Sequence, residues 1–214
     1  GAADVRELIG VEAYFHAGSA LKRVGEAYGE LPRELLAECV RGVIQAETCV
    51  FEDRGFPSAE VFEASWNENY LGSCRLYSSL DRTPQYNWFE YIADRQRGCS
   101  LFNRCKTAAI HAQDDGLVSL NGSFIDSFHE LGFSLTVDKD RVTAVQGNFL
   151  RVPDPICREN AAHLSLVLGK DLLSIDKRAI AKFAGGTYGC SHLVDLLVHA
   201  AKAYQDSKLT EVNV

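Results

Sequence analysis

The sequence TAAIHAQDDGLVSLNGSFIDSFHELGFSLTVDKDRVTAVQGN, residues 107–148, decides the fold. Apolar and polar side chains alternate along it, most clearly from Leu131 to Val137, and a period of two is typical of a half-buried antiparallel strand. Tight-turn signals occur at Asp114-Asp115-Gly116 and at Asp138-Lys139-Asp140. The stretch therefore predicts a four-stranded antiparallel meander, with strands over residues 107–112, 117–125, 130–137 and 142–148.

Helices are predicted on the C-terminal side of this sheet. Pro153-Asp154-Pro155 takes the chain out of the sheet, because proline cannot donate to a central ladder. Three helices follow, from Cys157 to Gly169, from Ser174 to Gly185-Gly186, and from Cys190 or Ser191 onward. The last helix carries an apolar stripe suited to docking on the sheet.

The chain before the sheet is predicted to be helical. Near-helical apolar spacing covers residues 4–29, a second helix opens at Leu31-Pro32 and runs to about Phe51, and Ser58 can cap a third. The fold class is therefore α+β. We expect a helical region at residues 1–100 and a sheet-plus-helices domain at residues 101–214.

Aromatic residues are concentrated between Trp66 and Phe102. One interpretation is that these rings fill the packing between helices. The other is a partner surface or the wall of a small-molecule pocket, with Asn67, Arg75, Arg95 and Asn103 as its polar fringe. The pattern alone leaves both interpretations open.

Composition limits the classes of partner. The net charge of −7 argues against sequence-independent nucleic-acid binding, which needs clustered Lys and Arg. No apolar run approaches the roughly 20 residues that span a bilayer. Seven cysteines are an odd number in a chain too long to need disulfides, so we expect a cytoplasmic protein. The chain opens Gly1-Ala2-Ala3 and contains no Met, which leaves a removed N-terminal signal open.

The candidate chemical centre combines two helix starts. Cys157 and Cys190 each follow a Pro-rich or Gly-rich turn, where a helix start favours thiolate over thiol. The glycines of the second turn, Gly185, Gly186 and Gly189, would let the backbone approach an ion or ligand. With His192, and with Asp126 or His129 from the turn between the second and third strands, these cysteines would suit zinc or iron.

Two other hypotheses use the same residues differently. Cys190, activated by its helix start and His192, could be the nucleophile of an enzyme acting on a small acyl or carbonyl substrate. Alternatively, Cys157 and Cys190 are packing residues and the aromatic segment makes the chain an interaction module. Under the metal hypothesis, the helical first half is expected to be a homodimer or partner surface.

A family resemblance is carried by the C-terminal half. Its most specific part is Gly185-Gly186-Thr187-Tyr188-Gly189-Cys190-Ser191-His192-Leu193. Further parts are Asp115-Gly116, Gly122 to Asp126, Leu135 to Asp138, Pro155-Ile156-Cys157 and Gly169-Lys170. This half resembles the prokaryotic family known as domain of unknown function 2889, over roughly residues 100–204. The resemblance implies a shared domain but no established activity.

A looser topological likeness is to iron–sulfur scaffolds of the NifU and IscU type. Those domains also place a short antiparallel sheet before helices, with a ligand cysteine after a strand. Cys157, Gly169-Lys170 and Cys190 stand in the corresponding order. This chain lacks the scaffolds' third cysteine between the two, so Asp126 or His129 would have to complete the ligand set.

Overall fold

The computed structural model describes residues 5–14, 16–81 and 102–211. These residues fall into two compact units. The first unit contains the described residues up to Phe62 together with Phe102 and Asn103, and the second contains Glu63 to Asp81 and the chain from Arg104 onward. The predicted α+β class is confirmed, with helices before and after a four-stranded antiparallel sheet.

The first unit is helical and begins with a short 3₁₀ turn, η1 (Arg6–Leu8), followed by α1 (Gly18–Tyr28) and α2 (Glu30–Val50). The predicted helix over residues 4–29 is wrong in its first part. Gly10 and His16 both have a φ of 73°, and this left-handed backbone interrupts a right-handed helix. The second predicted helix is found almost as expected, with Pro32 in its first turn.

A buried carboxylate joins parts of the first unit. Glu47 on α2 is 3% exposed. It accepts hydrogen bonds from the Tyr14 hydroxyl and from Arg54 Nε, the latter at 2.8 Å, and Arg54 also pairs with Glu12. A buried charge needs such partners because removing it from water is costly.

Helix α3 (Ala59–Tyr70) begins in the first unit and continues into the second. In the second unit, the Trp66 indole donates to the Tyr77 hydroxyl at 2.6 Å, and the Tyr70 ring lies 4.9 Å from that of Tyr77. These rings therefore fill internal packing, as the first interpretation of the aromatic segment predicts. Residues 82–101 of that segment lie outside the described residues.

The sheet of the second unit is a meander in the order β1 (Arg104–Ala112), β2 (Val118–Asp126), β3 (Glu130–Asp138) and β4 (Arg141–Arg151). Its register places Gly122 opposite Phe133. A Cβ at Gly122 would lie 2.6 Å from the Phe133 ring, so the absence of a side chain at Gly122 gives that ring its place in the core.

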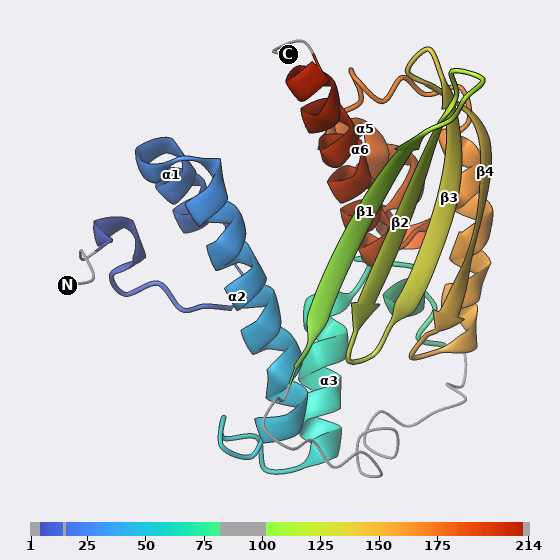
Figure 1. Ribbon diagram of the computed structural model, residues 1–214. Coiled ribbons are helices and arrows are strands. Elements are labelled where there is room, and N and C mark those ends of the chain that lie inside the picture. Colours follow the sequence, from blue (N-terminus) through green and yellow to red (C-terminus); the bar gives the residue numbers. More distant parts are fainter. Residues whose placement is uncertain (1–4, 15, 82–101, 212–214) are drawn as a thin grey trace. The chain divides into compact units, whose positions relative to one another are not determined.

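One face of the sheet is covered by the C-terminal segments, as Figure 1 shows. They are η3 (Pro155–Val167), α5 (Lys177–Ala184), the short turn η4 (Gly186–Tyr188) and α6 (Ser191–Glu211). The core includes fully buried Leu120 and Phe124 of the sheet and Leu193 and Leu196 of α6. None of the helices in the described ranges is long and apolar enough to cross a bilayer.

Candidate metal centre

The turn between β2 and β3 is held by the Asp126 side chain. Its Oδ1 accepts the backbone N–H groups of Phe128 at 2.7 Å and of His129 at 2.6 Å, and the Asp126 N–H donates to the His129 carbonyl at 2.9 Å. An aspartate that bonds to the backbone two residues ahead is a typical turn former. The turn therefore fixes Asp126 and brings His129 back toward it.

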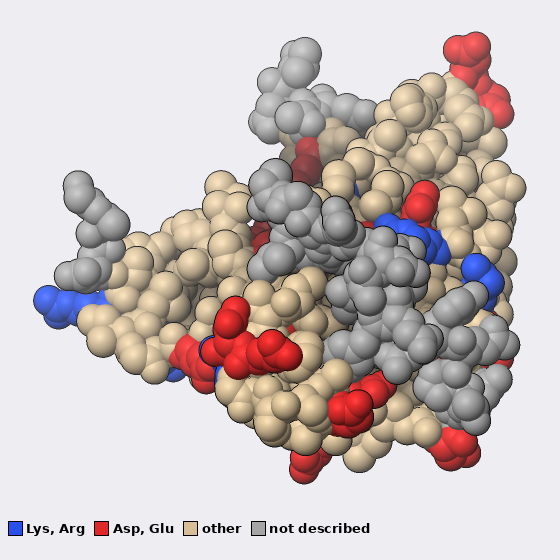
Figure 2. All heavy atoms as spheres, turned by 90° about the horizontal axis from the view of Figure 1, so that it is seen from below, with Lys and Arg blue, Asp and Glu red and all other residues tan. Residues whose placement is uncertain are grey.

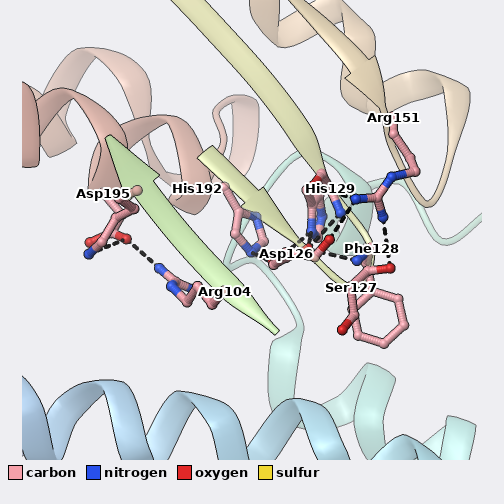
Figure 3. Close-up of polar contacts among 9 residues, drawn as sticks. Arg104, Asp126, Ser127, Phe128, His129, Arg151, His192 and Asp195 are labelled. Carbon is pink, nitrogen blue, oxygen red and sulfur yellow. Dashed lines mark hydrogen bonds and ion pairs between the residues drawn. The ribbon is translucent and has the colours of Figure 1, made fainter. Parts of the chain in front are cut away.

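Arg151 at the end of β4 holds the same turn from outside (Figure 3). Its Nη1 donates to the Ser127 carbonyl at 2.7 Å, and its Nη2 donates to the carbonyls of Asp126 at 2.6 Å and His129 at 3.1 Å. Backbone carbonyls that are shielded from water need hydrogen-bond donors. Here one guanidinium donates to three carbonyls. The sheet register explains this position, since Arg151 lies opposite Glu130, the first residue of β3.

His192, the second residue of α6, completes the group. Its Nε2 lies 3.7 Å from Asp126 Oδ2, and its ring centroid lies 3.8 Å from that of His129. His129 Nδ1 lies 3.0 Å from Asp126 Oδ1 and 3.2 Å from Oδ2. Each of the three residues can offer one ligand atom such that all the atoms lie within 4.8 Å of one another.

Electrostatics put two members of this group, Asp126 and His192, in the protonation states that can bind a cation. Burial alone would raise the pKa of Asp126, but the hydrogen bond and charge of His129 outweigh it and lower the pKa to about 2. Burial lowers the pKa of His192 well below its usual value, and the charge of His129 adds to this effect. At neutral pH Asp126 is therefore a carboxylate and His192 a neutral imidazole, the forms that ligate metals.

The geometry fits one small cation. Zinc lies roughly 2.0–2.2 Å from imidazole nitrogen and carboxylate oxygen, which places neighbouring ligands of a tetrahedral site about 3.3 Å apart. The separations of 3.0, 3.2 and 3.7 Å between Asp126 and the two histidines are close to that value. Two histidines and one carboxylate are also the ligand set of non-haem iron sites with open positions.

The two cysteines predicted as ligands lie outside this group. Cys157 and Cys190 are buried, at 7% and 6% exposure. Burial raises the pKa of Cys157, and it raises the pKa of Cys190 to about 12. The backbone N–H groups of Leu193 and His192 lower the pKa of the Cys190 thiol, but burial has the larger effect. Both residues pack in the main core, where burial outweighs the helix-start effect that favours thiolate.

Two of the three predicted ligand-approach glycines, Gly185 and Gly189, lie against the protein's own backbone, and a Cβ at Gly185 would lie 2.8 Å from the Ala181 carbonyl oxygen. Gly186 has a φ of 70°, and a Cβ at Gly189 would lie 2.3 Å from the Ala184 carbonyl oxygen. The Gly189 carbonyl accepts the Arg75 N–H at 2.9 Å. This tight turn places Cys190 and Ser191 at the start of α6, and through them His192.

Sequence reasoning missed Arg151 and the surroundings of His192. The Phe124 ring packs against His192 at 5.2 Å, and the Arg104 guanidinium lies 4.6 Å from the Phe124 ring centroid. Arg104 pairs with Asp195, which lies one helical turn after His192 on α6 (Figure 3). Lys106 pairs with the same carboxylate, at 3.1 Å. Counting outward from the β3–β4 turn would have paired Glu130 with Phe149, because two irregularities in the register, at Thr136/Val137 and at Glu130/Leu131, bring Arg151 opposite Glu130 instead.

The charges on one face of the molecule are seen in Figure 2. The Lys and Arg side chains of the described residues stand there in small separate groups and form no continuous basic patch. The lack of nucleic-acid binding stays a prediction from net charge.

Fold and site together define a class: a meander sheet backed on one face by helices, with an Asp-His-His group of two buried residues and one half-buried residue, His192. Residues 102–205 match the family described as "Protein of unknown function (DUF2889)". The predicted resemblance of the C-terminal half is thereby confirmed, and the match includes Asp126, His129, Arg151 and His192. No curated protein and no solved structure was found to match, so nothing there supports the looser likeness to iron–sulfur scaffolds.

Proposed function

We propose that the second unit is a metal-binding domain in which Asp126, His129 and His192 together bind one zinc or iron ion. The observation that carries the proposal is the convergence of three ligand atoms within 4.8 Å from the end of β2, the following turn and the start of α6. Cys157 and Cys190 are left out of the ligand set, because both are core residues with raised pKa values.

The ligand count indicates what the metal would do. Structural zinc sites use four protein ligands, whereas catalytic sites use three and keep a position for water or substrate. A site of one carboxylate and two imidazoles therefore supports Lewis-acid or water-activating chemistry for zinc, or open-position chemistry for iron. The Cys190 nucleophile hypothesis has weaker support, because a pKa of about 12 leaves little thiolate at neutral pH.

Elemental analysis and metal titration of the full chain test the proposal. We expect about one equivalent of zinc or iron after purification without chelator, and saturable Co²⁺ binding by the metal-free protein. His192→Gln should lose the metal while the fold persists, because His192 has no role in the β2–β3 turn. His111→Gln, an exposed histidine on β1, is the matched control and should bind like wild type.

The competing role is purely structural, with Asp126 closing a turn and the histidines packing beside it. Folded wild-type protein that takes up none of Zn²⁺, Fe²⁺ and Co²⁺ would establish that role and remove the metal proposal. Equal metal content in wild type and His192→Gln would instead mean that the metal lies at another site.

We also infer that the helical first unit mediates homodimer formation. Leu31, Leu35 and Val43 form one broad face of α2 and are 66%, 59% and 46% exposed. Burying such a stripe against a second copy would remove apolar surface from water.

A further inference from the structure

A second candidate site is a groove of about 530 Å³ between the loop after η3 and helix α5. Ile175, Ala179 and Phe183 form its apolar part, and Lys170, Ser174 and Lys182 give it polar groups. It shares no residue with the Asp126 group. Small-molecule sites have volumes of roughly 300–1,000 Å³ with mostly apolar walls and a few polar groups, and this groove is of that kind.

The loop that forms one wall is fixed by hydrogen bonds to the sheet and to α6. The Val142 N–H donates to the Lys170 carbonyl at 3.0 Å, and the Leu172 N–H donates to the Asp140 carbonyl at 2.8 Å. Gln205 of α6 donates to the Leu172 carbonyl at 2.9 Å and to the Ile175 carbonyl at 3.3 Å. A wall held in this way loses little conformational freedom when a ligand binds.

The charge of the groove favours an anion. Within the described part of the chain, neither Lys170 nor Lys182 takes part in an ion pair. The one carboxylate of the lining, Asp171, accepts the backbone N–H groups of Leu173 at 2.9 Å and Ser174 at 3.3 Å. The Lys170 ammonium lies 5.8 Å from the Phe183 ring centroid, so a cation stands next to the aromatic wall.

We propose that this groove binds a small organic anion, with an aromatic or branched apolar body against Phe183 and Ile175 and a carboxylate or phosphate between Lys170 and Lys182. The lysines supply charge-assisted hydrogen bonds, and the apolar part supplies burial. The inference does not depend on the metal proposal, because the two sites have no residue in common.

The test is an NMR titration of the ¹⁵N-labelled full chain with phenyl phosphate, benzoate, inorganic phosphate and benzyl alcohol. The two aromatic anions should shift the amides of residues 170–183 and bind more weakly as salt rises. Inorganic phosphate has the negative charge but no apolar body, and benzyl alcohol has the apolar body but no charge. Each should therefore bind at least about fivefold more weakly than the aromatic anions. Whichever of phenyl phosphate and benzoate binds more tightly shows whether the groove prefers a phosphate or a carboxylate.

Lys170→Ala and Lys182→Ala should each weaken binding of the aromatic anion about fivefold. Lys177→Ala is the matched control, because Lys177 lies on α5 with Lys182 but outside the groove. It should leave binding unchanged. His192→Gln should also bind normally, which separates this site from the metal centre. Unchanged affinity in the Lys170→Ala/Lys182→Ala double variant, equal binding of benzyl alcohol, or no shift at millimolar ligand would overturn the proposal.

Discussion

At the scale of single residues, the two carboxylate oxygens of Asp126 are used differently. Oδ1 accepts two turn N–H groups, and Oδ2 is the atom nearest to His192. The backbone N–H groups of the turn therefore fix the carboxylate through Oδ1, whereas Oδ2 faces the two histidine rings. Metal sites depend on such fixing by groups outside the ligand shell, which orient the ligands before the ion binds.

Arg151 gives the first prediction at this scale. Arg151→Ala removes the guanidinium donor of the Ser127 and Asp126 carbonyls and one of the two donors of the His129 carbonyl, so we expect the free energy of unfolding to fall by about 1–3 kcal/mol. We also expect metal affinity to fall about 10–100-fold, the usual effect of losing a group that orients ligands. Urea denaturation and Co²⁺ titration measure the two effects separately.

Arg158→Ala is the control, because its guanidinium makes only a 3.5 Å hydrogen bond to the Leu150 carbonyl. Arg151→Lys should recover part of the affinity, since a lysine can reach fewer of the three carbonyls. A variant that loses stability but keeps full metal affinity would show that Arg151 supports the fold alone.

The lowered pKa of His192 predicts acid sensitivity of the metal-free protein. The unfolded chain takes up a proton near pH 6.5, whereas the folded His192 resists it until lower pH. The unfolded state therefore binds more protons below pH 6.5, and the free energy of unfolding falls as the pH drops through this window toward the folded pKa.

His192→Gln should remove this loss, which amounts to about 1.4 kcal/mol per pH unit at most. Urea denaturation at pH 7.5, 6 and 5 in the presence of chelator gives the slope for each protein. His111→Gln should keep the wild-type slope. Parallel slopes for wild type and His192→Gln would mean that His192 accepts its proton equally well in both states.

Single residues also show how far sequence reasoning extends. The strand pattern predicts the turn that holds Asp126 and His129, and the glycines before the last helix predict that His192 lies at its start; the structure agrees on both positions. The helix starts of Cys157 and Cys190 predict thiolate character, whereas burial raises the pKa of both thiols. Whether a thiol is buried depends on what packs over it, and local sequence does not contain that information.

At the scale of secondary structure, the β2–β3 pair specifies its own packing through Gly122 and Phe133. Gly122→Ala should lower the free energy of unfolding by about 1–3 kcal/mol, because the added Cβ would lie 2.6 Å from the Phe133 ring. A second change, Phe133→Leu, removes the clashing ring. In a double-mutant cycle measured by urea denaturation, Gly122→Ala should therefore cost less in the Phe133→Leu background, and additive effects would contradict this account.

The strands were predicted more closely than the first helix, and backbone conformation explains the difference. Alternation reports directly which face of a strand is buried, so strand positions agree to within a few residues. Apolar spacing over residues 4–29 also suited a helix, but the left-handed backbone at Gly10 and His16 delays it until Gly18. A positive φ at a histidine leaves no mark in hydrophobic periodicity.

At the scale of the whole molecule, the two units divide the proposed roles. The candidate metal centre and the anion groove both lie in the second unit, and the exposed α2 face lies in the first. The family match begins at residue 102, so it covers the residues of both candidate sites and none of α2. We therefore propose that the first unit mediates self-association and that the second unit binds the metal ion and the small anion.

The homodimer predicted from α2 follows from its exposed face. Leu35→Glu places a charge in the middle of the apolar stripe, and a charge is costly to bury without a partner. We expect wild-type protein to sediment as a dimer at micromolar concentration and Leu35→Glu to sediment as a monomer, with metal content unchanged. Leu150→Glu on β4 is the matched control, because Leu150 is 63% exposed and Leu35 59%, and it should remain dimeric.

Cys39 allows an independent test of the proposed dimer interface. It is exposed and lies one helical turn from both Leu35 and Val43, so a second copy packed on this face would bring two Cys39 thiols near one another. A short bismaleimide should then link wild-type protein into covalent dimers, and Cys39→Ser should prevent the link. Wild-type protein that sediments as a monomer, or a dimer that Leu35→Glu leaves intact, would place any self-association on another surface of the molecule.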